Sequence, residues 1–567
     1  MDAAIFLLIM LAFLSVGKIV TRKIWRLEFA SSTEEFVFSS ALGSVVTSVM
    51  IAGLAFIGQV SSTTCWALLI FLLTTSLSFL KEVKHWNFKA SLIFFPLSPL
   101  KTSIQFILGI LVLLSLSLAL APAFATDALV YHLAVPKAYL EAGGIINLPN
   151  NFYSFFPQQI EMLYLFALAL GSDSLAQLTG LGIVFILLIS LWQYYRIKGS
   201  SIYAWLVPLV FISTPTFFSI SPSAYVDLQA ATYVFLTYYA WENGCTRNQP
   251  RWIFLMTLFA GAAVATKLTT VIILPLALLG LAVHGRSHKK ASQVAGQCLL
   301  LVLGSLMLIL PWLAKNYFYT GNPFAPFFMP FFGGESGMNW DISRSQQQFQ
   351  YYSSFGMGHS ILDFFMLPIN LTFFGQSHSL KFDGQIGILY LLLLPALFGL
   401  TRKSQSMIIV LLVLLVFWFI QTQYIRLLAP AFTFLSVLLV LGLEQGIQKH
   451  GPLVGKKEKI FLSIILSLGL LFNVSIITKE WSRINPIPYL LNKEYRHQFL
   501  TRQIKAYPLY LAANQMTEPE NKIFLVYMSD AHRLQLFYDI YGINLFVDDF
   551  FQSVVFKKSI AIKWPIH

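Results

Sequence analysis

Two aspartates and two cations stand where long polar loops meet apolar runs of this sequence. Asp127 follows one apolar run and Asp227 opens another, whereas Lys267 separates two runs and Arg426 closes a short turn before a further one. A carboxylate at the mouth of a cavity can accept a proton from an attacking hydroxyl. Arginine makes fork-like contacts to phosphate, and lysine supplies a point charge. These residue types therefore predict group transfer from a phosphate-bearing substrate.

Each of the four residues also has a structural explanation. Asp127 is well placed to cap a following helix, and an acid such as Asp227 is favoured in the first turn of a helix. Asp227 has a further possible role, as a second acid that orients the acceptor or ligates a divalent cation. Lys267 and Arg426 can reach lipid head groups from the edge of a membrane. At the level of the sequence these explanations stay open.

Four weaker candidates lie in the same outward loops or beside them. Glu161 and His132 are expected to line the same chamber as Asp127, although a single histidine on an amphipathic helix is often structural. Lys137 and Lys315 are candidates for binding the same phosphate.

The composition excludes a water-soluble globular protein. Of 567 residues, 57% are apolar and only 11% are charged, whereas soluble domains carry about 25% charged residues. Such a composition also excludes a disordered chain, and three cysteines provide neither a disulfide framework nor a zinc pattern. The sequence therefore predicts an all-α polytopic membrane protein.

Apolar runs of about the length of a membrane helix, roughly 20 residues, recur along the chain. We mark fourteen, within a range of thirteen to fifteen: 3–17, 37–59, 63–80, 103–124, 174–195, 202–220, 226–241, 252–265, 268–283, 294–314, 384–400, 407–420, 428–443 and 460–478.

The basic residues fix the orientation of these spans. With the chain starting outside, the loops on the cytoplasmic side hold 21 Lys and Arg residues and the opposite loops hold six, and eleven more follow residue 478. Loops rich in Lys and Arg stay in the cytoplasm. The net charge of +13 thus reports orientation and not a nucleic-acid partner. Both termini and the long loops 125–173 and 315–383 are predicted to face outward from a bacterial inner (plasma) membrane. The first run is predicted to be a retained membrane anchor and not a signal peptide, because its basic residues follow the apolar run instead of preceding it.

Two short helical stretches, 128–140 and 158–170, are predicted to lie along the membrane surface, since they are too short to span it. Phe152–Pro157 and Asn322–Phe332 are rich in aromatic residues and proline, which indicates an interfacial floor beneath a polar chamber.

The chain divides into three parts by these patterns. Residues 1–100 form accessory N-terminal membrane helices, 101–478 the core and 479–567 a small extracytoplasmic α/β domain. Within the last part we expect a polar helical stretch near 493–515, followed by the elements Ile523–Tyr527 as a strand, Ala531–Tyr541 as a helix and Ile543–Val547 as a strand.

Several short motifs in the core resemble the GT-C superfamily of polytopic glycosyltransferases, in particular a bacterial branch similar to protein O-mannosyltransferases and the lipid A aminoarabinose transferase. The resemblance covers roughly 100–440. The motifs are Thr126-Asp127-Ala128-Leu129-x-Tyr131-His132, Phe156-Pro157-Gln158-Gln159-Ile160-Glu161, Tyr225-Val226-Asp227, Gly261-x-x-x-Ala265-Thr266-Lys267, Lys315-Asn316 with Gly321-Asn322-Pro323, and Arg426-Leu427-Leu428-Ala429-Pro430.

The resemblance implies a transferase that moves a sugar from a polyprenyl-phosphate donor to a lipid, glycan or protein acceptor on the outer face, usually with inversion. Asp127 matches the catalytic base of that family, and Tyr131 joins the candidates for substrate binding. Where members often carry a second acid, this chain has Ala128. Asp227 is the only plausible substitute, so the need for a divalent cation stays open.

Two other classes of protein remain possible. A polytopic transporter or lipid flippase would suit fourteen spans, but such proteins commonly show repeated halves and ionisable residues near the bilayer midplane. A scaffold for envelope assembly would leave Asp127 as a helix cap. The acids at the mouths of long outward loops favour the transferase.

Overall fold

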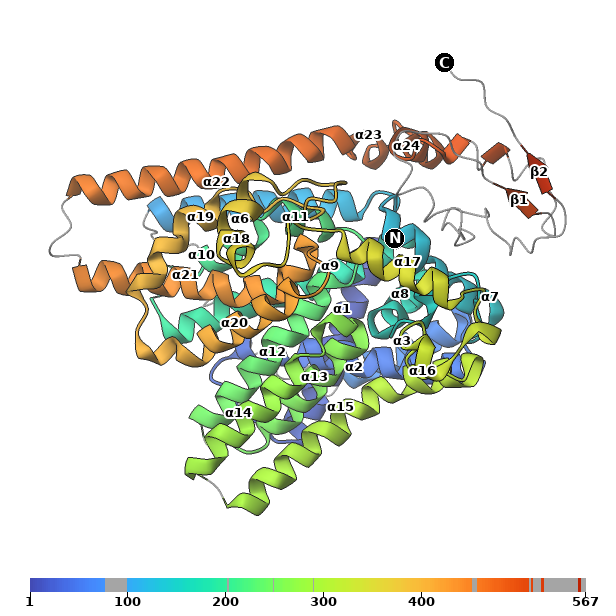
Figure 1. Ribbon diagram of the computed structural model, residues 1–567, viewed down its shortest axis with the longest axis horizontal. Helices are drawn as coiled ribbons and strands as arrows, with labels where there is room; N and C mark the ends of the chain where they lie inside the picture. Colours follow the sequence, from blue (N-terminus) through green and yellow to red (C-terminus); the bar gives the residue numbers. More distant parts are fainter. Residues whose placement is uncertain are drawn as a thin grey trace.

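Helices account for almost all of the described secondary structure (Figure 1). The computed structural model describes residues 1–76, 99–200, 203–247, 249–288, 290–450, 456–508, 511–512, 522–524 and 559–561.

Nine helices in the described residues are long and apolar enough to cross a membrane, which makes the chain a multi-pass membrane protein. They are α1 (Asp2–Lys18, continued by the π-helical turn Ile19–Ile24), α2 (Ser32–Phe56), α6 (Pro99–Ala119), α9 (Asp173–Lys198), α14 (Ile273–His288, with the preceding 3₁₀ turn Leu268–Thr270), α15 (Ala291–Thr320), α20 (Gln405–Phe419), α21 (Ala429–His450) and α22 (Lys456–Ile484).

The other five predicted runs also contain helix, but it is shorter or less apolar. The elements are α3 (Ser62–Thr74), α10 (Leu206–Ile212) with α11 (Pro215–Ile220), α12 (Asp227–Thr246), α13 (Trp252–Thr266), and α19 (Leu389–Leu393) with the 3₁₀ stretch Leu394–Gly399. Part of the run 63–80 lies outside the described residues. The total of fourteen spans therefore stays a prediction.

Proline explains why the run 202–220 is two helices. Thr214 adopts an extended conformation, and Pro215 is the first residue of α11. The ring of a proline disfavours helical geometry in the preceding residue, yet it suits the first turn of a new helix. The chain therefore breaks between α10 and α11.

The first two helices of the chain, α1 and α2, form a close pair. A Cβ atom at Gly17 would collide with the backbone carbonyl of Ser39, and one at Gly43 would collide with that of Phe13. Small residues allow membrane helices to approach through their backbones, which is how they pack without a hydrophobic driving force. α2 then packs against both α8 (Gln159–Leu170) and α9.

The two short outer stretches behave differently from each other. α7 (Ala134–Ala142) buries one face only, as expected for a helix at a surface. In α8, every residue except Leu168 is buried. The prediction that 158–170 lies along the membrane surface is therefore wrong for α8. After its first turn, which holds Gln159 and Glu161, α8 is apolar all round, and this is typical of a helix enclosed by others.

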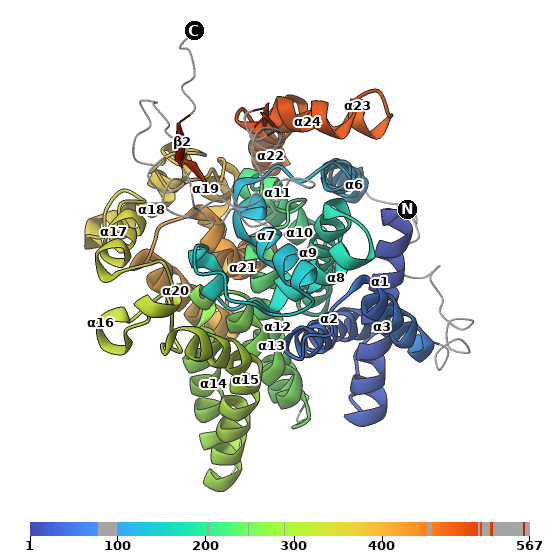
Figure 2. The same ribbon diagram turned by 90° about the vertical axis from the view of Figure 1, so that its right-hand side faces the viewer.

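The remaining described elements belong to the outer loops and the tail. They are the π-helical turn Ala128–His132, the 3₁₀ turns Phe152–Phe155, Glu335–Gly337, Arg402–Ser404 and Ile425–Leu428, α16 (Met329–Phe332), α17 (Ile342–Ser353), α18 (Ile361–Phe373), α23 (Ile487–Leu490), α24 (Arg496–Gln503), β1 (Lys522–Phe524) and β2 (Ser559–Ala561). In both ribbon views the α14–α15 hairpin projects from the bundle on the side away from α22 and α24 (Figures 1 and 2).

The tail is described only in part. β1 overlaps the predicted strand Ile523–Tyr527 and pairs in parallel with β2. Within the predicted helical stretch 493–515, the described residues contain α24 and further helical residues at 507–508 and 511–512. The predicted helix Ala531–Tyr541 and strand Ile543–Val547 lie outside the described residues, so the α/β domain stays a prediction.

Polar contacts agree with the predicted alternation of loops. Glu34, which is fully buried, accepts hydrogen bonds from Arg247 at 2.7 and 2.8 Å and from Tyr239 at 2.8 Å. Lys198 forms an ion pair with Glu242 at 2.9 Å. These contacts join loops that the charge pattern places on the cytoplasmic side.

The predicted outer loops are joined in the same way. Asp173 at the start of α9 binds Arg496, and Asp227 at the start of α12 binds Lys267. Which of the two ends faces the cytoplasm is given by the charge pattern alone.

We expect reporter fusions to place these ends on opposite sides. A phosphatase reporter that is active only outside should be active after Gly333 and after His567, and inactive after His450, because basic loops stay inside. A fluorescent reporter that folds only in the cytoplasm provides the reciprocal control. Cytoplasmic placement of the fusion after His567 would overturn the fourteen-span topology and the outward site.

Candidate active site

A cavity of about 1220 Å³ lies where the outer loops meet the ends of the helices. Its walls come from the segment after α6, from α8, from the chain breaks before α12 and after α13, and from the loops around α17 and before α21. Six of the nine candidate residues line this cavity: Asp127, Tyr131, His132, Glu161, Lys267 and Arg426. The prediction that His132 and Glu161 line the same chamber as Asp127 is therefore confirmed, and Tyr131, Lys267 and Arg426 line it as well.

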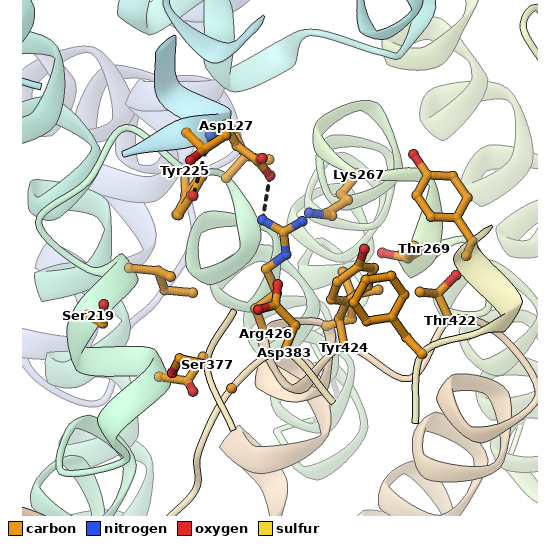
Figure 3. A pocket seen from close by; sticks show the side chains of 18 of the residues that line it. Asp127, Ser219, Tyr225, Lys267, Thr269, Ser377, Asp383, Thr422, Tyr424 and Arg426 are labelled. Carbon is orange, nitrogen blue, oxygen red and sulfur yellow. Dashed lines mark hydrogen bonds and ion pairs between the residues drawn. The ribbon is translucent and has the colours of Figure 1, made fainter. Parts of the chain in front are cut away.

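The Asp127 side chain binds Arg426 and does not cap a helix. Asp127 stands at the N-cap position of the turn Ala128–His132, yet its side chain makes no capping hydrogen bond. Its Oδ2 accepts hydrogen bonds from the Tyr131 hydroxyl, at 2.9 Å, and from Arg426 Nη1 (Figure 3). The capping explanation of Asp127 is thus excluded, and the carboxylate points into the cavity.

Arg426 is held between two aromatic rings. Its guanidinium carbon lies 5.5 Å from the centre of the Tyr225 ring and 5.1 Å from that of Tyr424. Such contacts attract a cation when it is shielded from water. Only 19% of the side chain is exposed. The guanidinium therefore faces the cavity and does not extend to lipid head groups.

Lys267 forms the second ion pair of the site. Its Nζ lies 2.6 Å from Oδ1 of Asp227, whose side chain is only 1% exposed. The lysine can reach the cavity because α13 ends at Thr266 and Lys267 itself is extended. Figure 3 shows the Lys267 and Arg426 side chains pointing toward one another. Asp227 lies behind Lys267 and does not line the cavity, so its contact with a substrate stays a prediction that the geometry does not favour.

The surroundings of Asp127 favour the ionised form of its carboxyl group. Burial raises the pKa of its carboxyl, but the Arg426 charge and the hydrogen bonds from Arg426 and Tyr131 outweigh burial and hold the pKa below its ordinary value. Burial and the neighbouring Asp127 charge raise the pKa of the Tyr131 hydroxyl well above its ordinary value. Tyr131 is therefore a neutral donor to a charged acceptor.

The predicted aromatic floor is present. Phe156 stacks on Phe327 with ring centres 5.6 Å apart, and both line the cavity. Beneath them Phe152 and Phe155 pack with Met329 and Trp340 in one buried cluster. The stretches 152–157 and 322–332 thus meet although about 170 residues separate them in the sequence.

Two of the predicted cations lie outside the cavity. Lys315 is buried beneath the floor, where its Nζ donates to the carbonyl of Ser154 and lies 5.9 Å from the rings of Phe155 and Trp312. Lys137 lies on α7 and forms an ion pair with Glu141 at 3.7 Å. Neither lines the cavity, so the structure gives neither of them a place beside a phosphate there.

The sequence did not single out several residues that line the cavity. They are Tyr225 and Tyr424, which flank Arg426, and Tyr153, Tyr351, Tyr352, His378, Asp383, Lys479, Glu480 and Arg483. Tyr225 stands in a quoted motif, but its type alone is common in membrane proteins. The others lie in outer loops or at helix ends, where no spacing rule relates them to Asp127.

A metal site is not apparent among the described residues. Within them, His, Cys, Asp and Glu side chains form no group of three that could hold a metal ion. The requirement for a divalent cation stays open.

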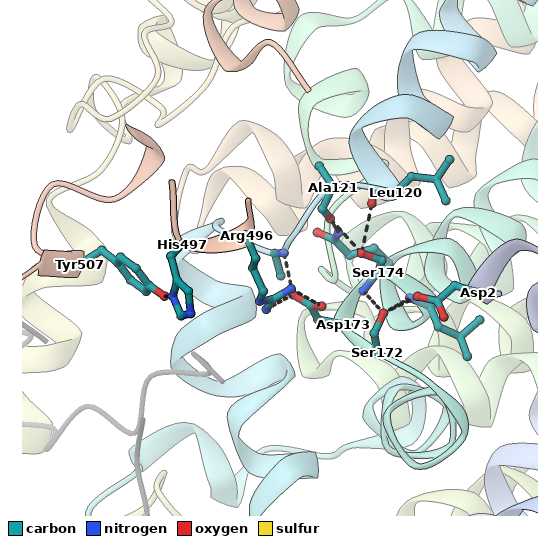
Figure 4. A network of polar contacts seen from close by, with 12 residues as sticks. Asp2, Leu120, Ala121, Ser172, Asp173, Ser174, Arg496, His497 and Tyr507 are labelled. Atoms are coloured by element: carbon teal, nitrogen blue, oxygen red, sulfur yellow. Dashed lines mark hydrogen bonds and ion pairs between the residues drawn. The ribbon is translucent and has the colours of Figure 1, made fainter. Parts of the chain in front are cut away.

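The loop that carries Asp127 is anchored by α9 and the tail. The backbone N–H of Ala123 donates to Asp173 Oδ2 at 2.8 Å, and Arg496 of α24 donates to both oxygens of Asp173 at 3.0 and 2.8 Å (Figure 4). Ser174 binds the carbonyls of Leu120 and Ala121. The segment after the last membrane helix therefore stabilises the position of the loop.

Comparisons with known proteins place the chain in a family without an assigned activity. The model of a protein family described as "Domain of unknown function (DUF8201)" matches residues 3–440. No curated protein matches the sequence. The match to the family spans all nine candidate residues and ends before α22.

A similar solved structure is that of ArnT from Cupriavidus metallidurans bound to undecaprenyl phosphate. It has 15% sequence identity to this chain and a TM-score of 0.48, and the match covers 78% of this chain and 85% of that one. With a TM-score below 0.5, this similarity indicates neither a reaction nor a set of acting residues here.

Replacing Arg496 should loosen the anchored loop. In Arg496→Gln the Asp173 carboxylate, only 2% exposed, loses its charged partner, and removal of one partner of a buried pair costs about 3–5 kcal/mol. We expect a clearly lower melting temperature in detergent. Arg483→Gln, which breaks a pair that is 59% and 42% exposed, is the control and should change stability by less than about 1 kcal/mol. Equal melting temperatures of Arg496→Gln and Arg483→Gln would contradict the anchoring role of Arg496.

Proposed function

Since the chain belongs to the DUF8201 family, whose description names no activity, we propose its function from the cavity itself: it is a membrane glycosyltransferase. It moves a sugar from a polyprenyl-phosphate donor to an acceptor hydroxyl on the extracytoplasmic face, with inversion at the anomeric carbon. The observation that carries this proposal is that the Asp127 carboxylate lies in one cavity with the side chains of Lys267 and Arg426.

The two cations suit the leaving group of such a reaction. Breaking the bond between the anomeric carbon and the phosphate oxygen leaves the electron pair, and hence a second negative charge, on the lipid phosphate. Lys267 and Arg426 would bind that phosphate more tightly as the charge develops, which lowers the barrier. Arginine offers two parallel donors to phosphate oxygens, and lysine adds a compact charge.

Asp127 suits the opposite half of the reaction. Its carboxylate would accept the proton of the acceptor hydroxyl while the acceptor oxygen bonds to the anomeric carbon, so the proton, the new bond and the departing phosphate balance. A positioned base of this kind contributes about 10²–10⁴-fold. The hydrogen bond from Tyr131 would hold the carboxylate in place during the transfer.

The resting ion pairs imply an exchange of partners when the donor binds. The two ion pairs Asp127–Arg426 and Asp227–Lys267 each carry no net charge. A phosphate that enters the cavity therefore competes with Asp127 for the guanidinium of Arg426. A carboxylate that loses this contact in a buried site gains basicity, because burial alone raises its pKa. Donor binding would thereby activate the base.

Asp127→Asn should abolish most of the transfer. The amide keeps the volume of the side chain but accepts no proton, so we expect a kcat lower by about 10²–10⁴-fold in purified protein supplied with polyprenyl-phosphate sugars and candidate acceptors. Asp341→Asn is the matched control, since Asp341 caps α17 outside the cavity and asparagine caps a helix as well as aspartate.

Wild-type turnover in a correctly inserted Asp127→Asn protein would remove Asp127 from the mechanism. Movement of the intact donor lipid across the membrane without cleavage would instead indicate a flippase.

Arg426→Gln should shift the pH dependence as well as the rate. Without the guanidinium, burial dominates and the pKa of Asp127 rises. The base is active when ionised, so the acid limb of the kcat/KM profile should move to higher pH.

Lys267→Gln is the control for this pH shift. It removes a cation that pairs with Asp227 and not with Asp127, so it should lower the rate and leave the acid limb in place. An unmoved limb in Arg426→Gln would show that Asp127 is not the titrating base.

A further inference from the structure

A further acid–base pair lines the cavity, and it is separate from the ion pairs Asp127–Arg426 and Asp227–Lys267 described above. His132 Nδ1 lies 2.7 Å from Glu161 Oε1. His132 ends the turn that begins after Asp127, and Glu161 lies in the first turn of α8. Both side chains are buried, at 2% and 6% exposure, and both line the cavity.

Each member of this pair keeps one polar atom without a hydrogen-bond partner among the described residues. These atoms are His132 Nε2 and Glu161 Oε2. Burying a polar atom without a partner costs about 1–3 kcal/mol. Such atoms are rare in folded proteins, and in a cavity they are available to a ligand or to ordered water.

The contact with Glu161 determines what His132 can bind. A carboxylate only accepts hydrogen bonds, so the proton between the two residues lies on Nδ1. In the neutral imidazole Nε2 is then an acceptor. The ring is fixed by Tyr131, whose ring centre lies 4.0 Å away, and by an edge contact with Tyr225 at 5.9 Å. With the ring neutral, Nε2 and Glu161 Oε2 are two acceptors that have no donor among the described residues.

We propose that His132 and Glu161 form a hydroxyl-binding subsite, in which His132 Nε2 accepts a hydrogen bond from an alcohol group of the ligand and Glu161 fixes the ring. Phosphate is not the ligand of this subsite, because an acceptor and a carboxylate repel an anion. The subsite lies in the same cavity as Lys267 and Arg426. It therefore binds a hydroxyl of the donor sugar or of the acceptor alcohol while the cations bind the phosphate. This assignment of roles rests on the proposed function.

Binding measurements separate the subsite from the transfer reaction. Affinities for polyprenyl phosphate and for a polyprenyl-phosphate hexose are measured on purified protein in detergent, by thermophoresis. We expect His132→Phe to weaken binding of the sugar-bearing lipid about tenfold, the loss expected when a buried acceptor is removed, and to leave the sugar-free lipid unaffected. His132→Gln, whose amide oxygen can replace Nε2, should recover part of the affinity.

Two further variants test how the ring is held. Glu161→Gln keeps an acceptor for Nδ1–H and should retain most of the affinity, whereas Glu161→Leu should lose as much as His132→Phe. His284→Phe is the matched control, because His284 lies on α14 and does not line the cavity. It should bind both lipids like the wild type.

The outcomes distinguish the source of the hydroxyl. If His132→Phe binds both lipids normally but raises the KM for the acceptor alcohol, the subsite holds the acceptor. If neither donor affinity nor acceptor KM changes, the subsite is refuted. If the wild type binds neither lipid, the polyprenyl-phosphate donor is refuted, and saturation-transfer NMR with methyl hexosides decides on the subsite. Equal saturation transfer from the wild type and from His132→Phe to the hexoside would then overturn the subsite.

Discussion

The ion pair between Asp127 and Arg426 is the contact on which the site depends. Neither group tolerates transfer out of water without a partner, because an uncompensated buried charge costs several kcal/mol. The pair forces the loop after α6 to meet the turn before α21, across about 300 residues of sequence. Tyr225 and Tyr424 shield the guanidinium, and the anchors at Asp173 and Ser174 hold the loop that carries the carboxylate.

Charge balance gives the cavity its chemical character. In the two ion pairs each cation already binds an acid, so a phosphate that binds Arg426 takes the place of the Asp127 carboxylate. The same exchange that binds a phosphate frees a base, and this couples donor binding to the activation of an acceptor. The His132–Glu161 pair does not take part in this exchange, and its free acceptors suit the uncharged part of a substrate.

The features that depend on local composition and hydropathy could be predicted from the sequence. The composition and the apolar runs predicted a helical membrane protein, and each run contains helix. Asp127, Lys267 and Arg426 were singled out because they lie at the ends of apolar runs on one predicted side, and they line one cavity. The prediction for α8 was wrong, because a short apolar sequence is the same for a helix at a membrane surface and for one inside a bundle. Lys137 and Lys315 were given the same role as Arg426, because a position on one side of the membrane does not determine the distance between two residues on that side.

The sequence by itself thus determined the class of protein and the approximate positions of its helices, and it predicts the side of the membrane on which the site lies, because hydropathy and charge act residue by residue against the bilayer. Only the tertiary structure decided which acid pairs with which cation, that Asp227 stands behind Lys267, and that Tyr225, Tyr424 and Asp383 belong to the site. Those choices depend on how helices pack against one another. Packing is settled by the shapes of side chains distant in the sequence, and no local pattern encodes it.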